Sequence, residues 1–365
     1  MQTAAVLPTL GIGDALLMMI ASQQLKLGGY CVTTFHHSLP ELSSWFPGHE
    51  LRSSSDSLDS FDLILVENDN SPKIKQLLSQ YRSKLSIFYP TYSPSKHAPL
   101  SPQDRVFNEE LPMADNVARS IASLLYCVRM ENKNFDSARQ SQIEAQWSER
   151  GEHSRMAMSD EEDRSGKVAA SQNFYFSSEY SISLVSASKD NGICPPVGLA
   201  HRSNKTQVVI HPTSRIPAKN WRPQGFFEVA RKLKEKGFHP LFCVAPMEQQ
   251  AWKIVEAQGF PLAQLSTLAD LAKTLHKSGF VIGNDSLIGH LGSNLGIPTL
   301  IIANDEKRMR LWRPGWHPGR LVLPPSYLPN WKYIRLHWQQ FIRPRDVLKS
   351  FDELVHTATA DAVCV

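Results

Sequence analysis

A short polar segment between two apolar runs is the first candidate for chemistry. The stretch FVIGNDSLIGHLGSNLGIPTL (280–300) runs from an apolar segment into Asn284, Asp285 and Ser286, and His290 follows one helical turn later. In a parallel α/β domain, ligands bind beyond the carboxyl ends of strands. The free N–H groups and the dipole of a helix N-terminus favour a phosphate there. We therefore expect these polar residues to surround an anion; the alternative is an ordinary helix cap, from Asp285 or Ser286, plus a half-buried histidine.

A basic loop after another apolar run offers cationic groups for an anion. The segment HPTSRIPAKNW (211–221) carries Thr213 and Ser214 at the end of an expected strand, with Arg215 and Lys219 close behind. Lysine or arginine neutralises the charge that grows on a diphosphate leaving group without help from a metal. No Asp-x-Asp pair for a divalent metal accompanies this segment. The sequence predicts a metal-independent phosphate-binding loop, with a basic surface loop as the alternative.

The N-terminal stretch PTLGIGDALL (8–17) places Gly11, Gly13 and Asp14 between an expected strand and an expected helix. Leu16 stands where a dinucleotide fingerprint needs its last glycine, so that motif is not supported. The glycines let a ligand approach the backbone closely. Asp14 either caps the helix or acts as a general base.

Two further features are open to a functional and a structural interpretation. Glu248 follows the apolar run LFCVAP and is placed either to accept hydrogen bonds from ribose hydroxyls or to start a helix as a solvated glutamate. The stretch RMRLWRPGWHPGR (308–320) mixes arginines with Trp312 and Trp316. It suits an anionic acceptor and the packing of a loop equally.

The elements that must position these residues alternate between strands and helices. Apolar runs typical of strands lie within 4–10, 30–37, 61–69, 86–90, 206–212, 238–246, 280–285 and 297–305, with one more expected within 180–187. Helical patterns lie within 13–29, 71–85, 115–130, 222–237, 247–259, 266–279, 286–296 and 343–358. Such alternation implies parallel βαβ units. Gly237 is expected as a helix C-cap, and Thr267 and Asp270 have the spacing of a capping box.

Bulk properties exclude several classes of protein. A chain of 365 residues with 42% hydrophobic and 20% charged residues is long enough for two globular domains. The net charge of +4 permits anionic ligands or an anionic membrane surface but is far from a nucleic-acid footprint. Five scattered cysteines without CxxC spacing argue against a disulfide framework and a structural zinc. The apolar run ALLMMIA is too short for a signal peptide or a membrane span, so we expect a cytoplasmic protein.

Taken in order, these stretches resemble glycosyltransferase family 9, the ADP-heptose:lipopolysaccharide heptosyltransferases. The matching segments are LGIGDALLMM, VVIHPTSRIPAKNWRPQGFFEVARKLKEKG, LADLAKTLHKSGFVIGNDSLIGHLGSNLGIPTL and LWRPGWHPGR. The resemblance implies an α/β GT-B fold, with two facing Rossmann-like domains, parallel sheets and a cleft between them. We expect an acceptor-side domain at 1–130, a polar and partly mobile linker or insertion at 131–204, and a nucleotide-sugar-binding domain at 205–342. A last helix within 343–360 is expected to pack back on the first domain.

The resemblance also implies a role for each matching residue. Asp14 would be the base that deprotonates the acceptor hydroxyl, with Gly11 and Gly13 allowing close backbone approach. Thr213, Ser214 and Lys219 would hold the diphosphate, Glu248 would lie near the ribose, and Asp285, Ser286 and His290 would bind the phosphates and the sugar. Transfer would be inverting, with neither metal nor cofactor. ADP-heptose is the expected donor, and a lipopolysaccharide core sugar or similar glycolipid at the inner face of the inner membrane is the expected acceptor; no nucleic acid is involved.

The chain departs from the family pattern at several positions, which keeps alternatives open. Leu287 stands where the family usually has glycine, ANDEK (303–307) replaces Pro-Thr-Asp-Pro, and the segment 131–204 has no counterpart. A different donor sugar or acceptor, including a protein acceptor, is one alternative. A nucleotide-sugar epimerase or hydrolase and a non-catalytic GT-B scaffold are the others, although a scaffold has no need of Asp14, Lys219 and His290.

Overall fold

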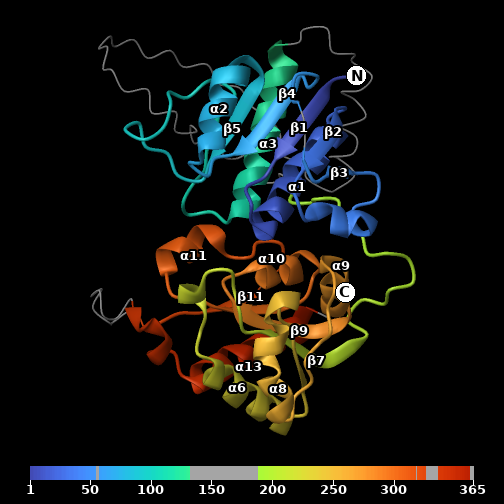
Figure 1. The fold of residues 1–365 in the computed structure, drawn as a ribbon, viewed down its shortest axis with the longest axis vertical. Helices are drawn as coiled ribbons and strands as arrows, with labels where there is room; N and C mark the ends of the chain where they lie inside the picture. Colours follow the sequence, from blue (N-terminus) through green and yellow to red (C-terminus); the bar gives the residue numbers. More distant parts are fainter. Residues whose placement is uncertain (55–56, 132–187, 318, 326–335, 362–365) are drawn as a thin grey trace. The chain divides into compact units, whose positions relative to one another are not determined.

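The computed structural model describes residues 1–54, 57–131, 188–317, 319–325 and 336–361 (Figure 1). Residues 1–121 and 188–365 form one compact unit, and its described part carries both sheets. Of the second unit, residues 122–187, only the end of helix α3 (Met113–Glu131) is described. The strand expected within 180–187 lies outside the described residues.

The first sheet contains six parallel strands in the order β3-β2-β1-β4-β5-β6. Their bounds are β1 Thr3–Leu7, β2 Cys31–Phe35, β3 Glu50–Arg52, β4 Leu63–Glu67, β5 Leu85–Tyr89 and β6 Arg105–Val106. Strands β4 and β5 are buried at every residue, as expected for apolar runs in a parallel sheet that is covered on both faces. The strand order reverses between β1 and β4, which is where doubly wound folds bind ligands.

The second sheet contains five parallel strands in the order β11-β10-β9-β7-β8. Their bounds are β7 Asn204–His211, β8 His239–Phe242, β9 Ser278–Asn284, β10 Thr299–Ile302 and β11 Gly319–Val322. Here the order reverses between β7 and β9, and His211 pairs with Gly283 at their carboxyl ends. The two sheets confirm the predicted pair of Rossmann-like α/β domains.

Most helices follow the predicted pattern, with small differences at their ends, but the helix at 306–312 was not predicted. They are α1 Ile12–Leu27, α2 Pro72–Tyr81, α6 Pro223–Glu235, α7 Gln249–Trp252, α8 Ile254–Ala257, α9 Leu268–Lys277, α10 Leu287–Asn294, α11 Glu306–Trp312 and α13 Pro344–Asp361, with 3₁₀ turns η1 Leu39–Trp45, η2 Arg82–Lys84, η3 Pro217–Lys219, η4 Pro246–Glu248 and η5 Trp338–Gln340. The capping box is confirmed, because the Thr267 hydroxyl accepts a hydrogen bond from the Asp270 N–H. Helix α6 has Lys236 as its C-cap, and the predicted Gly237 comes one residue later with a positive φ of 85°. In the described part of the chain, no helix is long and apolar enough to cross a membrane.

The single helix predicted within 247–259 is wrong. That segment forms η4, α7 and α8 in succession. Val255 is the one buried residue that α7 and α8 contribute, so little packing favours a continuous helix.

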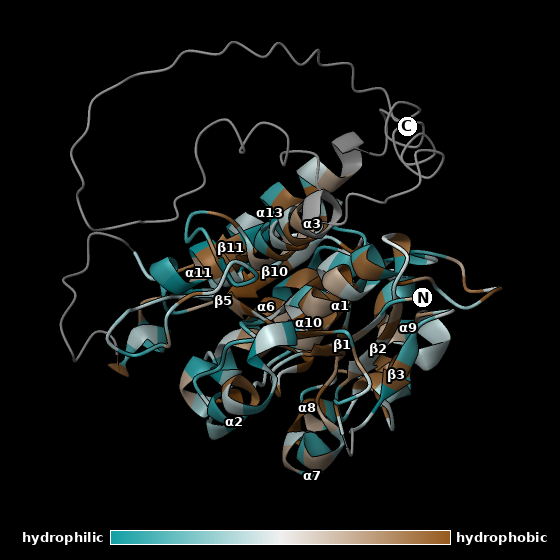
Figure 2. Ribbon diagram, turned by 90° about the horizontal axis from the view of Figure 1, so that it is seen from above, coloured by the Kyte–Doolittle hydropathy of each residue, from teal (hydrophilic) through white to brown (hydrophobic). Residues whose placement is uncertain are grey.

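The second sheet packs its main apolar core against α6 and α13. Phe351 of α13 is fully buried, and its ring lies 5.1 Å from those of Phe238 and Phe280. Lys236 after α6 also pairs with Asp352 of α13 at 2.6 Å. The prediction that the last helix packs back on the first domain is therefore wrong, because its apolar face meets the second sheet. Figure 2 shows the hydrophobic colouring concentrated on the strands and the hydrophilic colouring on the exposed sides of the surrounding helices.

A second apolar cluster joins elements that pack against the first sheet to elements that pack against the second. Helix α1 and the turn η1 contribute Leu16, Met19 and Trp45 to the same cluster as residues of α9 and α10. The described end of the predicted linker packs beside it: the Asn191 side chain donates to the Leu16 carbonyl at 3.1 Å and to Asn294 at 2.9 Å. Asn191 thus holds the described end of this segment against α1 and α10.

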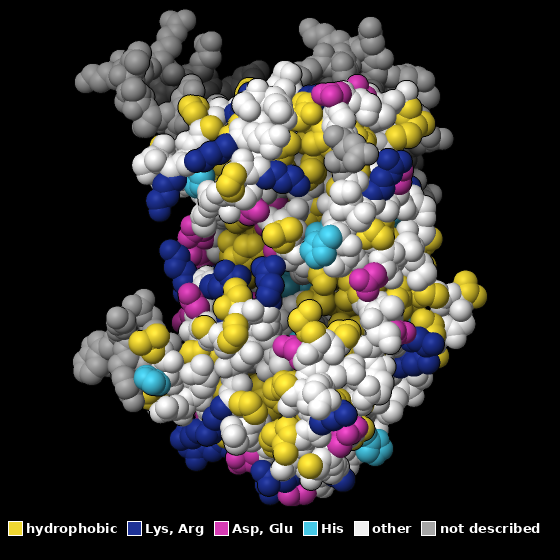
Figure 3. Space-filling view, viewed as in Figure 1, with side chains coloured by type: hydrophobic (Ala, Val, Ile, Leu, Met, Phe, Trp, Pro, Cys, Tyr) yellow, Lys and Arg dark blue, Asp and Glu magenta, His cyan; other side chains and the backbone are white. Residues whose placement is uncertain are grey.

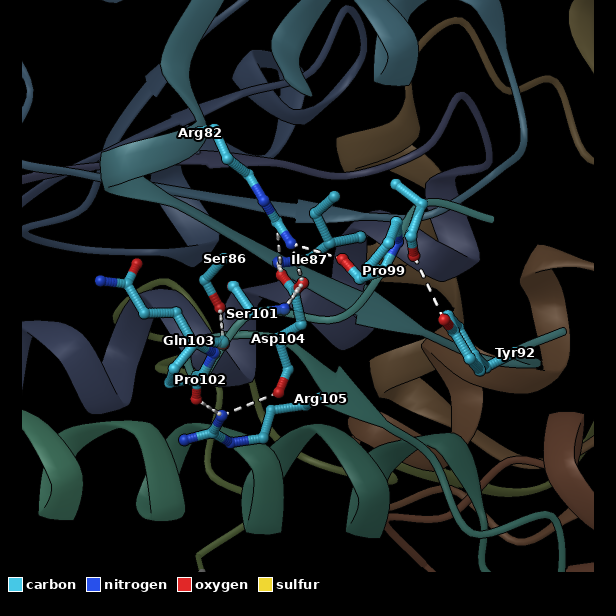
Figure 4. Close-up of polar contacts among 11 residues, drawn as sticks. Arg82, Ser86, Ile87, Tyr92, Pro99, Ser101, Pro102, Gln103, Asp104 and Arg105 are labelled. Atoms are coloured by element: carbon cyan, nitrogen blue, oxygen red, sulfur yellow. Dashed lines mark hydrogen bonds and ion pairs between the residues drawn. The ribbon is translucent and has the colours of Figure 1, made fainter. Parts of the chain in front are cut away.

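A buried ion pair fixes the segment that links β5 to β6 (Figure 4). The Asp104 side chain is fully buried and accepts hydrogen bonds from the Arg82 guanidinium at 2.8 Å and from the Ile87 and Ser101 N–H groups at 2.9 and 2.8 Å. Its oxygens are therefore satisfied, as a buried carboxylate requires. The pair holds the loop that follows β5 against the sheet edge.

Candidate functional site

The predicted site residues gather at the two points where the strand order reverses. Pro8 to Asp14 follow β1, whose neighbour β4 ends at Glu67. Thr213 to Lys219 follow β7, whose neighbour β9 ends at Asn284. These two points of strand-order reversal, called switch points below, thus both carry polar residues at strand ends, where α/β folds bind ligands.

Asp14 lies in the first turn of α1 and does not cap the helix. The N-cap residue is Gly11, and no side chain caps it. The Asp14 carboxylate accepts a hydrogen bond from the Thr9 hydroxyl at 2.7 Å. A Cβ at Gly11 would collide with the Asp14 carboxylate, which explains why glycine stands there. Asp14 therefore keeps a partly exposed carboxylate that is held by a single described hydrogen bond.

Glu67 is a buried acid beside Asp14 that the sequence analysis did not single out. It ends β4 with 2% of its surface exposed, and the Thr9 N–H hydrogen-bonds its carboxylate. Burial, reinforced by Asp14 and Asp69, raises the pKa of Glu67 well above its ordinary value. No described cation pairs with Glu67 to offset the cost of burying its charge. The run FDLILVEND carried the signal, since its apolar strand ends in acidic residues.

Two cations converge on Asp285 at the second switch point. Lys219 Nζ lies 2.7 Å from Asp285 Oδ2, and Arg308 Nε of α11 lies 3.3 Å from the same oxygen. The Asp285 side chain is only 10% exposed. Asp285 therefore acts as an ion-pair partner and not as a helix cap. Arg308 is a second residue that the prediction missed, although it begins the arginine- and tryptophan-rich stretch at 308–320.

The side chain of Ser286, the N-cap of α10, does not form the expected capping hydrogen bond. Its hydroxyl is buried and has no hydrogen-bond partner among the described residues. Asn284 is fully buried, and its Oδ1 accepts from the Trp221 N–H at 2.9 Å while its Nδ2 finds no described partner. Hydrogen-bonding groups at this helix N-terminus are therefore available to a ligand.

His290 is buried between the two groups of residues. A Cβ at Gly13 would lie 3.0 Å from His290 Cδ2, so the imidazole rests against the first turn of α1. On another side its ring meets Trp316 edge-on, with the centroids 6.3 Å apart. Burial lowers the pKa of His290, although Asp14 and Asp285 act in the opposite direction. Gly13, which is predicted to let a ligand approach the backbone, thus also makes room for the histidine.

The remaining predicted residues form two hydrogen-bonded pairs. The Thr213 hydroxyl donates to Glu248 at 2.8 Å, and the Ala245 N–H donates to the same carboxylate oxygen at 3.1 Å. Glu248 is therefore a half-buried, fixed acceptor and not a solvated glutamate. The Ser214 hydroxyl lies 2.6 Å from Asn220 Oδ1 and 2.8 Å from the Ile216 carbonyl, so it stabilises the basic loop itself.

Leu287, which replaces the glycine of the family pattern, packs against the apolar cluster shared by α1, α9 and α10. Among the residues that the structure describes, no group of three or more His, Cys, Asp or Glu side chains is placed to hold a metal ion. The arrangement instead offers a carboxylate at one switch point, and two cations plus an open helix N-terminus at the other. Those groups suit proton abstraction and the stabilisation of an anionic leaving group.

Comparison with known proteins agrees with this arrangement. Residues 169–314 match the model of glycosyltransferase family 9 (heptosyltransferase), and this range contains Lys219, Asp285, His290 and Arg308. No curated protein matches the chain in sequence.

Solved structures show the same fold at low sequence identity. The E. coli ADP-heptose LPS heptosyltransferase II is 16% identical, with a TM-score of 0.59 over 98% of this chain and 100% of that one. The E. coli heptosyltransferase WaaC with ADP is 12% identical, with a TM-score of 0.59 over 97% and 100%. A family 9 glycosyltransferase from Veillonella parvula is 12% identical, with a TM-score of 0.53 over 98% of both chains. Residues 169–314 thus match glycosyltransferase family 9 (heptosyltransferase), and the chain shares the fold of these heptosyltransferase structures, as its motifs indicated.

Proposed function

We propose that the protein transfers a sugar, with inversion and without a metal, from a nucleotide-sugar to a glycan hydroxyl. ADP-heptose is the best candidate donor, because two of the structural relatives are described with ADP or as ADP-heptose enzymes. A lipopolysaccharide core or a similar glycolipid is the candidate acceptor, reached by peripheral association with the inner face of the membrane. The observation that carries the proposal is that the Asp14 carboxylate lies at one point of strand-order reversal and the cations Lys219 and Arg308 at the other, with the buried His290 against the first turn of α1.

In the proposed reaction, Asp14 removes the proton from the acceptor hydroxyl. The acceptor oxygen then attacks the anomeric carbon from the side opposite the diphosphate, and the bond from that carbon to the phosphate oxygen breaks. Negative charge grows on the departing nucleoside diphosphate, where Lys219 and the N-terminus of α10 offset it. The Thr9 hydroxyl orients Asp14 through its hydrogen bond at 2.7 Å.

The nucleoside is proposed to lie near the Thr213–Glu248 pair. Glu248 already accepts two described hydrogen bonds on one carboxylate oxygen, so its other oxygen is available for a ribose hydroxyl. The Thr213 hydroxyl fixes the orientation of that carboxylate. A fixed acceptor of this kind costs less entropy on binding than a mobile side chain.

The proposal is tested by calorimetric binding of ADP, UDP and GDP without added metal. Lys219→Ala should weaken ADP binding by about 1–3 kcal/mol, the usual size for a hydrogen bond to a charged group. Lys232→Ala is the matched control, because Lys232 is an exposed lysine of α6 that pairs with Glu235. Asp14→Asn should keep ADP binding and lose sugar transfer, because only the base is removed.

Each outcome bears on a different part of the proposal. Preference for UDP or GDP would keep the glycosyltransferase and discard heptose as the donor sugar. Failure to bind any nucleotide would contradict the proposed reaction. Full transfer activity in Asp14→Asn would show that another group is the base.

A further inference from the structure

Asp285 holds two cationic side chains at one oxygen. Lys219 Nζ and Arg308 Nε lie 2.7 and 3.3 Å from Asp285 Oδ2. A single carboxylate balances only one of these charges, so the group of three carries a net positive charge. The Lys219 side chain is 18% exposed and that of Arg308 is 41% exposed. The guanidinium is therefore the more accessible of the two cations.

Local structure places Arg308 at this position. Asp305 caps helix α11 by accepting the Arg308 N–H at 3.0 Å, which sets the start of the helix. The Arg308 guanidinium also lies over the ring of Trp312, 5.1 Å from its centroid. Stacking and the ion pair restrict the side chain before any ligand arrives. Asp305 of the ANDEK segment (303–307) thus serves to position an arginine.

Buried polar groups without described partners lie beside the same carboxylate. Asn284 Nδ2 and the Ser286 hydroxyl flank Asp285 along the chain, and His290 Nδ1 lies one helical turn further on. Asn284 is fully buried and His290 is 6% exposed. A buried donor that is left unpaired costs free energy, so such groups indicate a polar ligand. With two cations beside them, that ligand is an anion.

We propose that Arg308 is a donor-binding residue that, together with Lys219, binds the diphosphate of the nucleotide-sugar. The inference rests on the proposed function and adds a residue to it. A nucleoside diphosphate gathers more charge as its glycosidic bond breaks than one lysine neutralises. An arginine presents a planar fork that binds two phosphate oxygens at once. Asp285 keeps the two cationic groups adjacent so that both face the same anion.

The surroundings of α11 supply a matched control. Figure 3 shows Lys and Arg side chains gathered beside Asp and Glu side chains at the position of α11. Arg310, on the same helix, pairs with Glu110 at 3.3 Å and Glu306 at 3.4 Å, and its side chain is 52% exposed. Arg310 thus shares the helix and the charge of Arg308 but has other partners.

The test is calorimetric binding of ADP, without added metal, to the full chain and its variants. Arg308→Gln should weaken binding about 10-fold or more, whereas Arg310→Gln should change it by less than about 2-fold, as is usual for exposed ion pairs. Arg308→Lys should restore part of the affinity, because it keeps the charge and loses the fork. Circular dichroism checks that each variant is folded.

The possible results separate the inference from the proposed function. If ADP binds the wild type and Lys219→Ala weakens it while Arg308→Gln does not, Arg308 is only a structural partner of Asp285 and the inference is wrong. Equal losses in Arg308→Gln and Arg310→Gln would also overturn it, because they indicate a general effect of charge. If the wild type binds none of ADP, UDP and GDP, the proposed function fails and the inference fails with it.

Discussion

Replacing Gly13 by alanine should slow the enzyme without destabilising it. The added Cβ would lie 3.0 Å from His290 Cδ2, 3.6 Å from Cγ and 3.8 Å from Nε2. The first distance is shorter than ordinary carbon–carbon contact, which begins near about 3.5 Å. The imidazole must therefore move by a few tenths of an ångström. Trp316 lies on another side of the ring, so that movement disturbs the site.

The size of the effect follows from two opposing contributions. Alanine in place of glycine within a helix stabilises a protein by up to about 1 kcal/mol, and Gly13 lies in the first turn of α1. A misplacement of about 1 Å in an active site costs roughly 100-fold in rate, so a shift of a few tenths should cost about 10-fold. We expect kcat to fall about 10-fold while the thermal midpoint stays the same or rises slightly.

The assay is the initial rate of sugar transfer, measured beside thermal unfolding. The double variant Gly13→Ala/His290→Ala is the control, because without the imidazole the added methyl group has nothing to displace. The cost of Gly13→Ala should then largely disappear in the His290→Ala background. Wild-type kcat in Gly13→Ala, or an undiminished cost in the double variant, would refute this explanation of the glycine.

Two further predictions concern stability. Burial and Asp14 raise the pKa of Glu67, so the folded state keeps a proton that the unfolded chain releases above about pH 4.5. The free energy of unfolding therefore falls as the pH rises, by up to about 1.4 kcal/mol per pH unit. Glu67→Gln should remove this fall in urea unfolding as the pH rises above about 4.5; an unchanged slope would contradict the raised pKa of Glu67. Phe351→Ala should lower the free energy of unfolding by about 3–5 kcal/mol, because the ring is fully buried against Phe238 and Phe280. A loss below about 1 kcal/mol would show that α13 contributes little to the second domain.

The sequence was sufficient to predict the positions of those candidate-site residues that lie close to strand ends. Asp285, Ser286 and Thr213 follow apolar runs directly, and ligands of parallel α/β folds bind at that edge. Asp14 was found the same way, between a strand and a glycine-rich helix start. Local pattern and one rule of topology therefore predicted the positions of these residues, although not their partners.

Partners between distant residues could not be predicted in this way. Arg308 reaches Asp285 from another helix, and the stretch that contains it was equally suited to packing a loop. Glu67 ends a strand like many other polar residues, and only the strand order reveals that it adjoins the loop of Asp14. Helix α13 has an amphipathic pattern that fits either sheet, because periodicity identifies an apolar face and not the surface that covers it.

The charges around His290 decide whether its imidazole adds a further cation to the candidate site. Burial, with the cations Lys219 and Arg308 acting in the same direction, outweighs Asp14 and Asp285 and lowers the pKa of His290, so the ring is neutral near neutral pH. A charged imidazolium would add a third cation beside Lys219 and Arg308. The neutral ring leaves these two side chains as the cations offered to the proposed donor. Burying the histidine against Gly13 therefore keeps the positive charge of the candidate site on Lys219 and Arg308.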